Sequence, residues 1–599
     1  MTSGGQYGTG GVVGYVCNVP ATMKNCLNTG TVTGSAETYA YVGGLCGGVR
    51  IGAASLTIED CLNTGKIQFT VPDGSNSAGG SLVGGNALES GVTIKNYAYA
   101  TTQSFAKPVG GNEPILSDGA IVQLDENIIK GYGGFLNTDL SLDNTGSATT
   151  GSGTWVAIVD QVPVPKTLED MISGGRVDLS CFIIGDNTTA TKGTDVGDYN
   201  YQYTVDNEDY YATYLSKLEG LGFGEPYASS VVDNVSSTTF KKDDLVLVVT
   251  KANGKTHISA SSGDAVSERL LNTATSQTVD DGYTATTTLD VTLGMPRLST
   301  EEAMSFVIQL KNGHFIIYDG GETAADLEVL MTYLTERSDN KKPIIDAWVV
   351  SHAHNDHFGI KFVETLISDY ADDIYVESIY FNQPTDALAV ADDPTYDMTM
   401  TRYENIKTLA GVLNTTQGAH PKVYRPHTGQ KYYFDGVSMD IVLTQEHIDI
   451  ANTEEQDFNE TSTWCMFNIE RGTETEKVLI GADGGEIGMT FVQGAYTTGY
   501  LAVDVFAALH HGSNTNSTFK KYCTVDKVVL YAHTADPIAT GSIWDYFKES
   551  YQNNKSLIDS VTTGVEDQNG TTHKYFYYGQ GTVVLTFASD AVKANLITE

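Results

Sequence analysis

The fold and the chemistry of this chain are decided by one stretch, Ser351-His-Ala-His-Asn-Asp-His-Phe-Gly359. It directly follows Ile344-Ile-Asp-Ala-Trp-Val-Val350, a nearly continuous apolar run typical of a strand that is covered on both faces. Three histidines and an aspartate at the end of such a strand are costly to bury unless something binds them. Because imidazole and carboxylate groups bind borderline cations such as zinc, the stretch predicts a metal site.

The spacing within this stretch indicates two metal ions rather than one. His352 and His354 are alternate residues of an extended loop, so we expect them to point to the same side. Asp356 and His357 then reach a second point a short distance away. A chance cluster of histidines in a loop is the alternative, and it explains neither the aspartate nor the buried strand.

The flanking sequence predicts an α/β sandwich from about residue 286 to 599. Residues 305–310 and 314–318 form a predicted hairpin around Asn312-Gly313, a turn signal. A predicted helix follows, and then the apolar strand 344–350. This alternation of strands and helices is typical of sheets covered by helices. The apolar face of the predicted helix consists of Leu327, Leu330, Met331 and Leu334.

The HxHxDH motif of residues 352–357 resembles that of the metallo-β-lactamase superfamily, and the resemblance spans about 286–599. It implies an αββα sandwich that holds two zinc ions, with manganese or iron as alternatives. By the order of the family's motifs, Asp319 is a structural neighbour of the metal loop and Asp483 is the metal-bridging carboxylate. One residue of the pair His510-His511 is the last metal histidine, and His510 is favoured because it directly follows a predicted strand.

The sequence departs from the family at the third histidine of the first metal. That place reads Asn459-Glu-Thr-Ser-Thr463, so we expect the first metal to be bound weakly or not at all unless another residue replaces the histidine. His420, His427 and His447 lie upstream and are expected to be surface loop residues. The Asn-x-x-Ser variant together with His-His-Gly-Ser resembles the hydrolase domain of bacterial DNA-uptake channel proteins. Members of that branch are thought to act on phosphodiesters, and a phosphorylcholine esterase of bacterial surfaces is a second relative.

These features predict a metal-dependent hydrolase that acts on a phosphoester or phosphodiester. A water bound to the metal loses its proton near neutral pH and becomes the nucleophile, oriented by Asp356. Ser513, Asn514 and Asn516 are the candidate substrate contacts. Two alternatives stay open: a hydrolase of lactones, β-lactams or thioesters, and a surface adhesin whose hydrolase domain is weak or inactive.

The N-terminal region is repetitive. Asn25-Cys-Leu-Asn-Thr-Gly30 recurs as Asp60-Cys-Leu-Asn-Thr-Gly65, a step of 35 residues, and each copy follows a glycine-rich run. Such a period predicts stacked β units, a β-solenoid over 1–113 in which Cys26 and Cys61 face inward. The pattern resembles the GLUG repeat of bacterial surface proteins. Residues 114–175 are predicted to be a connector or solenoid cap, and 176–285 a small α+β accessory domain, with His257 on the surface of a strand.

Composition limits the partners and the location. The formal net charge of −39, from 74 acidic and 35 basic residues, disfavours a protein that grips nucleic acid by its phosphates. We expect a small-molecule or cell-surface phosphoester as substrate. The sequence contains no apolar stretch long enough for a membrane span. The first residues read as the interior of a repeat, so the natural chain is expected to extend further, with the protein outside a bacterial cell or on its surface.

Overall fold

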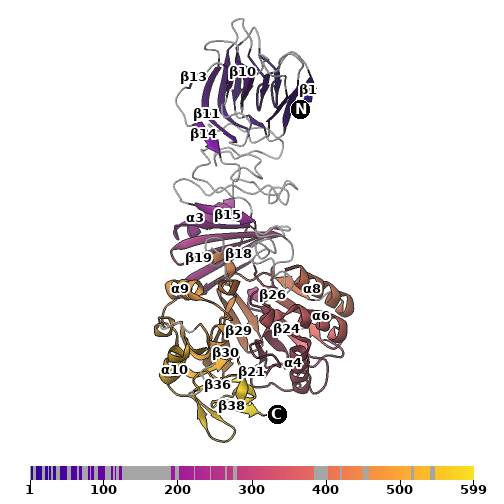
Figure 1. Ribbon diagram of the computed structural model, residues 1–599, viewed down its shortest axis with the longest axis vertical. Coiled ribbons are helices and arrows are strands. Elements are labelled where there is room, and N and C mark those ends of the chain that lie inside the picture. Colours follow the sequence, from indigo (N-terminus) through magenta and orange to yellow (C-terminus); the bar gives the residue numbers. More distant parts are fainter. Residues whose placement is uncertain are drawn as a thin grey trace. The chain divides into compact units, whose positions relative to one another are not determined.

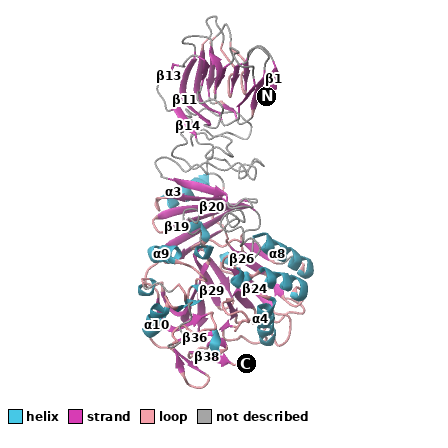
Figure 2. Ribbon diagram, in the orientation of Figure 1, coloured by secondary structure: helices cyan, strands magenta, loops and turns pink. Residues whose placement is uncertain are grey.

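The computed structural model forms two compact units, Met1–Asp195 with Tyr199–Gly224, and Val196–Asp198 with Glu225–Glu599 (Figures 1 and 2). The structure describes strands and turns between residues 2 and 124, then 190–195 and 201–220. It also describes 223–598, apart from 243–244, 263–265, 274–278, 384–402, 419–420, 449–457, 515–517 and 540–546. The boundaries predicted at 113, 175 and 285 stay predictions, and most of the 114–175 connector lies outside the described residues.

The N-terminal unit is built from repeats that stack through parallel strands. Leu56 lies opposite Ala21 of the preceding repeat and opposite Val92 of the following one. The buried side chain of Asn63 accepts a hydrogen bond of 2.8 Å from Asn28, which is 35 residues earlier. Cys61 is buried and its sulfur accepts from the Cys26 amide at 3.4 Å. This layering, one repeat above the next, is what a 35-residue period predicts.

The described elements of this unit and their bounds are β1 (Thr2–Gly4), β2 (Gly8–Gly10), β3 (Ala21–Lys24), β4 (Leu27–Asn28), β5 (Val32–Ser35), β6 (Tyr41–Gly43), β7 (Leu56–Asn63), β8 (Ile67–Thr70), β9 (Ala78–Gly80), β10 (Val83–Asn86), β11 (Val92–Ala100), β12 (Val109–Gly111), β13 (Ile115–Leu116), β14 (Ile121–Leu124), β15 (Ala190–Asp195), β16 (Tyr201–Val205) and α3 (Tyr210–Gly220).

The second unit begins with four antiparallel strands, β17 (Ala228–Val232), β18 (Val235–Lys242), β19 (Leu245–Ala252) and β20 (Lys255–Ser262). Strands β19 and β20 form a hairpin around Asn253-Gly254, where both residues have positive φ, 51° and 77°, as this type of turn requires. His257 of β20 is 7% exposed, so the prediction that it lies on the surface is wrong. Its ring packs edge-on against His447, with ring centroids 4.0 Å apart.

Two mixed sheets packed face to face form the rest of this unit. The first has the order β27-β26-β24-β23-β22-β21-β37-β38-β34-β35, with β25 beside β24, and the second has the order β28-β29-β30-β31-β32-β33-β36. The strands of the first sheet are β21 (Thr292–Met295), β22 (Ser305–Gln309), β23 (Phe315–Asp319), β24 (Ile344–Val350), β25 (Tyr375–Val376), β26 (Ser378–Phe381), β27 (Lys422–Tyr424), β34 (Val565–Asp567), β35 (Thr572–His573), β37 (Thr582–Phe587) and β38 (Val592–Ile597). Those of the second are β28 (Lys431–Phe434), β29 (Val437–Leu443), β30 (Trp464–Arg471), β31 (Glu474–Ile480), β32 (Ala502–Ala507), β33 (Thr524–Tyr531) and β36 (Tyr575–Tyr577).

Alternating side chains of each strand divide between two cores, which produces an αββα layering. In β23, Ile316 and Tyr318 face the second sheet, whereas Phe315 and Ile317 face the helices. The predicted apolar face of residues 327–334 is confirmed, because it packs into this outer core. Helices on the other side cover the second sheet in the same way. The helices are α4 (Ala324–Arg337), α5 (Asn355–Phe358), α6 (Ile360–Thr365), α8 (Tyr403–Gln417), α9 (Glu486–Ala495) and α10 (Tyr551–Ser560).

Among the described residues, no helix has both the length and the apolarity that crossing a membrane requires.

Candidate metal centre

The predicted metal ligands follow the carboxyl ends of two pairs of parallel strands. Asp319 ends β23, and the loop that carries His352 follows the adjacent strand β24. In the second sheet, Asp483 follows β31 and the pair His510-His511 follows the adjacent strand β32. Since the carboxyl ends of neighbouring parallel strands lie at one edge of a sheet, each sheet gathers its own polar residues. The packing of the two sheets then brings both sets together.

Asp319 fixes the loop that follows β24. Its carboxylate is fully buried and accepts hydrogen bonds of 2.8 Å from the amide of Ser351, from the hydroxyl of Ser351 and from Nδ1 of His357. A histidine that donates through Nδ1 leaves Nε2 as the nitrogen that can bind a metal. Burial raises the pKa of Asp319, which opposes the effect of these donors. Asp319 thus orients His357 without itself belonging to the donor groups described below.

Four side chains form one group of donor atoms: Asp356, His357, Asp483 and His511, whose ligand atoms all lie within 4.8 Å of one another. Nε2 of His357 lies 3.0 Å from Oδ1 of Asp483 and 3.6 Å from Oδ2 of Asp356. Nε2 of His511 lies 3.4 Å from Oδ1 of Asp483 and 3.0 Å from Oδ2 of Asp356. The histidine rings alternate with the carboxylates around a common centre.

His352, His354 and Asp483 form a second such group within the same limit of 4.8 Å. Nε2 of His352 lies 3.9 Å from Oδ2 of Asp483, and the rings of His352 and His354 have centroids 4.8 Å apart. Asp483 therefore belongs to both groups and presents a different oxygen to each. We call the group of His352 the first position and the group of His511 the second position.

Both positions fit a metal ion by the chemistry of their donors. Four ligands about 2.1 Å from a zinc ion stand about 3.4 Å apart in a tetrahedron, and the donor spacings here run from 3.0 to 3.9 Å. Nε2 of His352, Nε2 of His357 and Oδ1 of Asp483 are buried and make no hydrogen bond to any described residue. Buried polar atoms left in this state are costly, so a cation is the partner that this arrangement lacks.

The charges of the second position are strongly coupled. Burial alone would lower the pKa of His357, but Asp483, Asp356 and Asp319 raise it well above its usual value. Burial alone would likewise lower the pKa of His511, but Asp483 and Asp356 raise it to about 10. In the first position, burial and the neighbouring histidines lower the pKa of His352 instead. His357 and His511 would have to release protons to hold a cation at the second position, so the affinity of that position would depend on pH.

The choice between His510 and His511 differs from the sequence-based preference. His511, and not His510, belongs to the second position, where it is 1% exposed and its Nδ1 lies 3.0 Å from the carbonyl oxygen of Ala532. Both histidines have left-handed backbones, with φ of 49° and 54°. This conformation costs about 1–2 kcal/mol for each residue that is not glycine. The strand ends at Ala507, so His510 does not directly follow it, and the left-handed turn at these two histidines places His511 in the second position.

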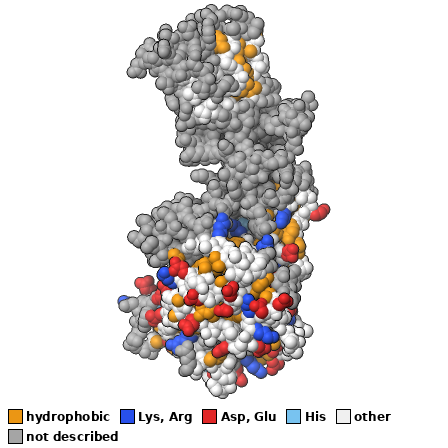
Figure 3. All heavy atoms as spheres, turned by 90° about the vertical axis from the view of Figure 1, so that its right-hand side faces the viewer, with side chains coloured by type: hydrophobic (Ala, Val, Ile, Leu, Met, Phe, Trp, Pro, Cys, Tyr) orange, Lys and Arg blue, Asp and Glu red, His pale blue; other side chains and the backbone are white. Residues whose placement is uncertain are grey.

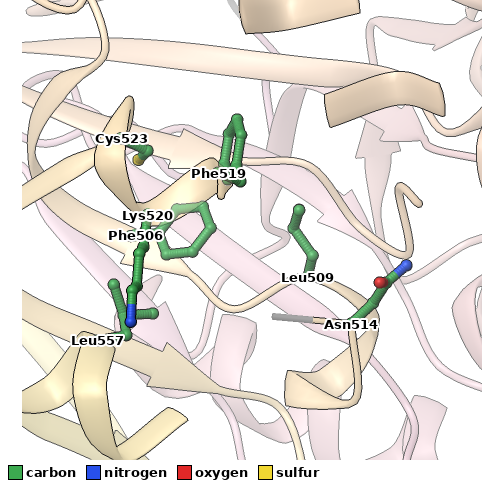
Figure 4. A pocket seen from close by; sticks show the side chains of 7 residues that line it. All are labelled: Phe506, Leu509, Asn514, Phe519, Lys520, Cys523 and Leu557. Atoms are coloured by element: carbon green, nitrogen blue, oxygen red, sulfur yellow. The ribbon is translucent and has the colours of Figure 1, made fainter. Parts of the chain in front are cut away.

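The predicted substrate contacts lie on the loop after this pair. The hydroxyl of Ser513 donates to the carbonyl oxygen of His510 at 2.8 Å, so it holds the turn. Asn514 lines a hollow between β32 and α10, where Figure 4 shows it beside Leu509 and across from Phe519. Asn516 lies outside the described residues. The hollow is mostly apolar, being lined by Phe506, Leu509, Asn514, Phe519, Lys520, Cys523 and Leu557.

The histidines that were expected at the surface lie inside. His427 is 2% exposed, and both ring nitrogens of His447 are buried. The Nδ1 of His427 lies 2.9 Å from Glu446, whose pKa falls to about 2 because this contact outweighs the effect of burial. The surface prediction for these two residues is therefore wrong, because a buried carboxylate and the β20 strand cover them. His420 lies outside the described residues.

Asn459 occupies a buried 3₁₀ turn, Phe458–Thr461, beside the metal loop. Phe458 of this turn packs against Ala353, between His352 and His354. The neighbouring Glu460 accepts hydrogen bonds of 3.1 and 2.9 Å from the amides of Ile487 and Gly488, at the start of α9. The segment that lacks the expected histidine thus supports the loop that carries the other two.

Two residues near the second position were not predicted. Nε2 of His533 lies 3.7 Å from Glu302, and this contact lowers the pKa of Glu302, an effect that burial and Asp356 oppose and His511 supports. His533 follows the end of β33, the strand next to β32. Its position after a third strand end was the signal in the sequence that could have identified it.

Neither a known protein family nor a curated protein matches the sequence. Among solved structures, the chain is similar to CmlA, a diiron beta-hydroxylase from Streptomyces venezuelae, with 14% identity and a TM-score of 0.29 over 50% of this chain. A mutant of CmlA gives 13% identity and a TM-score of 0.28 over 52% of this chain. In both cases this chain spans 55% of the CmlA chain, about half of its length.

The chain is also similar to the metallo-beta-lactamase GOB-18 from Elizabethkingia meningoseptica. The identity is 13% and the TM-score 0.22, over 48% of this chain and 95% of that chain.

Proposed function

We propose that the C-terminal half of the chain is a metal-dependent hydrolase that cleaves phosphoester or phosphodiester bonds. The observation that carries this proposal is the pair of donor groups that share Asp483 at the carboxyl edge of the two sheets. Zinc is the metal that suits these imidazole and carboxylate donors best, and manganese or iron would use the same side chains.

Each side chain of the centre has a separate task. His352, His354 and Asp483 would hold the first cation, and Asp356, His357, Asp483 and His511 the second. When bound, a pair of divalent cations supplies a water of lowered pKa and polarises the bond to be broken. Asp356 is 28% exposed at its side chain, so it can accept a hydrogen bond from a water that arrives from solvent. Asp319 and the carbonyl of Ala532 hold the rings of His357 and His511 in place.

A phosphoester is favoured over a carbonyl substrate by the absence of the third histidine in residues 459–463, which carbonyl hydrolases of this fold generally keep. The resemblance to DNA-uptake hydrolase domains points the same way. A small or surface-bound phosphoester is favoured over nucleic acid by the net charge of −39. On the face of the second unit in Figure 3, acidic and basic side chains of the described residues are interspersed, and such a surface offers little attraction to a polyanion.

The proposal is tested with the zinc-loaded full chain and three substrates: bis-p-nitrophenyl phosphate, p-nitrophenyl phosphate and nitrocefin. We expect phosphate ester cleavage that Asp483→Asn abolishes, because both cations lose their shared ligand. Asp590→Asn, at an exposed carboxylate, is the control and should leave the rate unchanged. Nitrocefin turnover without phosphate ester turnover would replace the proposal by a carbonyl hydrolase. No turnover by a protein that holds two zinc ions would refute it.

We also propose that the protein is displayed outside a bacterial cell, with the stacked repeats of the N-terminal unit as a stalk. The support is the resemblance of these repeats to those of surface proteins and the strongly acidic composition. Labelling of the native protein on intact cells by an antibody against the hydrolase half would support this location. Labelling only after lysis would contradict it.

A further inference from the structure

The first position is one ligand short. It has three donors, His352, His354 and Asp483, whereas the second position has four. A structural zinc site is almost always four-coordinate, and a catalytic one keeps three protein ligands and an open place. Because residues 459–463 contain no histidine, a further imidazole at this position would have to come from another part of the chain.

We propose that His510 is this further ligand, so that the adjacent pair His510-His511 serves both metal ions. The inference rests on the proposed function, since it assigns a residue to the same metal pair. Nε2 of His510 lies 3.7 Å from Oδ2 of Asp483, the oxygen that His352 approaches at 3.9 Å. His511 instead approaches Oδ1 of Asp483, at 3.4 Å. The two neighbouring histidines thus approach different oxygens of the same carboxylate.

The backbone explains how adjacent residues reach opposite sides of one carboxylate. Both His510 and His511 have positive φ, and Gly512 follows with φ of 105°. The amide of His510 donates to the carbonyl oxygen of Ala482, directly before Asp483, at 2.9 Å. This bond ties the turn to the strand end that carries the shared carboxylate. The two rings have centroids 6.0 Å apart and planes at 60°, so they diverge from each other.

The two histidines also differ in exposure. The side chain of His510 is 33% exposed, whereas that of His511 is 1% exposed. His510 therefore lies on the side of the first position that solvent reaches, where a ligand can be added or released without opening the core.

The test compares His510→Asn with His511→Asn, because asparagine accommodates the left-handed backbone of both positions. Zinc per chain is counted after equilibrium dialysis, and the two affinities are measured by competition with a chromophoric chelator. Loss of an outer partner of a metal ligand costs about 10–100-fold in affinity, so His510→Asn should weaken one zinc site by at least that factor and leave the other unchanged. His573→Asn, in a hairpin outside both donor groups, is the histidine control.

Double variants show which of the two metal ions His510 binds. If His510 and His352 bind the same ion, His510→Asn with His352→Ala still binds one zinc ion at wild-type affinity, whereas His510→Asn with His511→Asn binds both ions more weakly. Melting curves of the zinc-free variants exclude a folding defect as the cause. Two zinc ions at wild-type affinity in His510→Asn, or none in the variant that combines it with His352→Ala, would overturn the assignment. Since no readout is turnover, a protein that binds two ions without cleaving phosphate esters fails only the proposed function.

Discussion

Asp319→Asn isolates the part that this buried carboxylate plays in the metal centre. Asn fits the backbone of this residue, whose φ is 59°, and it has nearly the same shape. Its remaining oxygen can still accept the amide hydrogen of Ser351. The other oxygen, which now receives the Ser351 hydroxyl and Nδ1 of His357, becomes an NH₂ group that can only donate.

The expected effect has two components. Two hydrogen bonds to a charged acceptor are lost, each worth about 1.5–3 kcal/mol, so the free energy of unfolding of the zinc-free protein should fall by about 3–6 kcal/mol. His357 must also move its proton to Nε2, the nitrogen that faces Asp356 and Asp483. A protonated Nε2 cannot bind a cation, so zinc affinity at the second position should fall about 10–100-fold.

Zinc affinity from chelator competition and the urea unfolding of the zinc-free protein measure the two components separately. Asp346→Asn is the matched control: this carboxylate is also buried and contacts a histidine, Nδ1 of His314, at 2.8 Å. It lies on β24 about 17 Å along the chain from Ser351, so it should lower stability and leave zinc affinity unchanged. Wild-type zinc affinity in Asp319→Asn would refute the role assigned to Asp319, whatever happens to stability.

Three further predictions concern other parts of the chain. Glu460→Ala removes the carboxylate that accepts two amide hydrogens at the start of α9 and should lower the free energy of unfolding in urea by about 3–6 kcal/mol; an unchanged midpoint would exclude this capping role. Burial lowers the pKa of His447 to about 4. His447 is therefore protonated below about pH 6.5 in the unfolded chain but only below about pH 4 in the folded chain. The free energy of unfolding of the protein should therefore fall by about 2 kcal/mol from pH 7 to 5. The variant His447→Phe keeps the stacking on Phe491, and its free energy of unfolding should fall less over the same range. Equal falls in both proteins would contradict this prediction. Finally, a Cβ on Gly43 would lie 2.1 Å from the carbonyl oxygen of Cys46. Gly43→Ala should therefore reduce the β signal in circular dichroism without changing the number of zinc ions bound. An unchanged spectrum would mean that the repeats are packed differently.

Features that depend on local sequence could be predicted well. The apolar run 344–350 predicts a buried strand. The three histidines and the aspartate of residues 352–357 predict metal ligands at the end of that strand, so the two patterns support each other. The 35-residue step fixes the parallel stacking of Asn28 on Asn63 for a similar reason, since each repeat must match the next.

Features that depend on distant contacts could not be predicted. His427 and His447 were expected at the surface because nothing in their local sequence shows the burial that Glu446 and β20 provide. The choice between His510 and His511 depends on their left-handed backbones in the loop after β32, and a strand pattern says nothing about the conformation of residues beyond its end.

The exposure of the ligands indicates where a substrate would enter. His352, His357, Asp483 and His511 are all at most 2% exposed at the side chain, so the buried half of the centre is closed. The exposed part includes His354 and Asp356, in the loop after β24, and His510, in the loop after β32; the side chain of Asp356 is 28% exposed and that of His510 33%. Ser513 and Asn514 follow His510 on the same loop, so a group that reaches this open side meets the candidate substrate contacts there. If His510 binds the first metal from the open side, loss of that metal would free the loop that carries His510, Ser513 and Asn514 to move. Substrate affinity and occupancy of the first position should therefore rise and fall together.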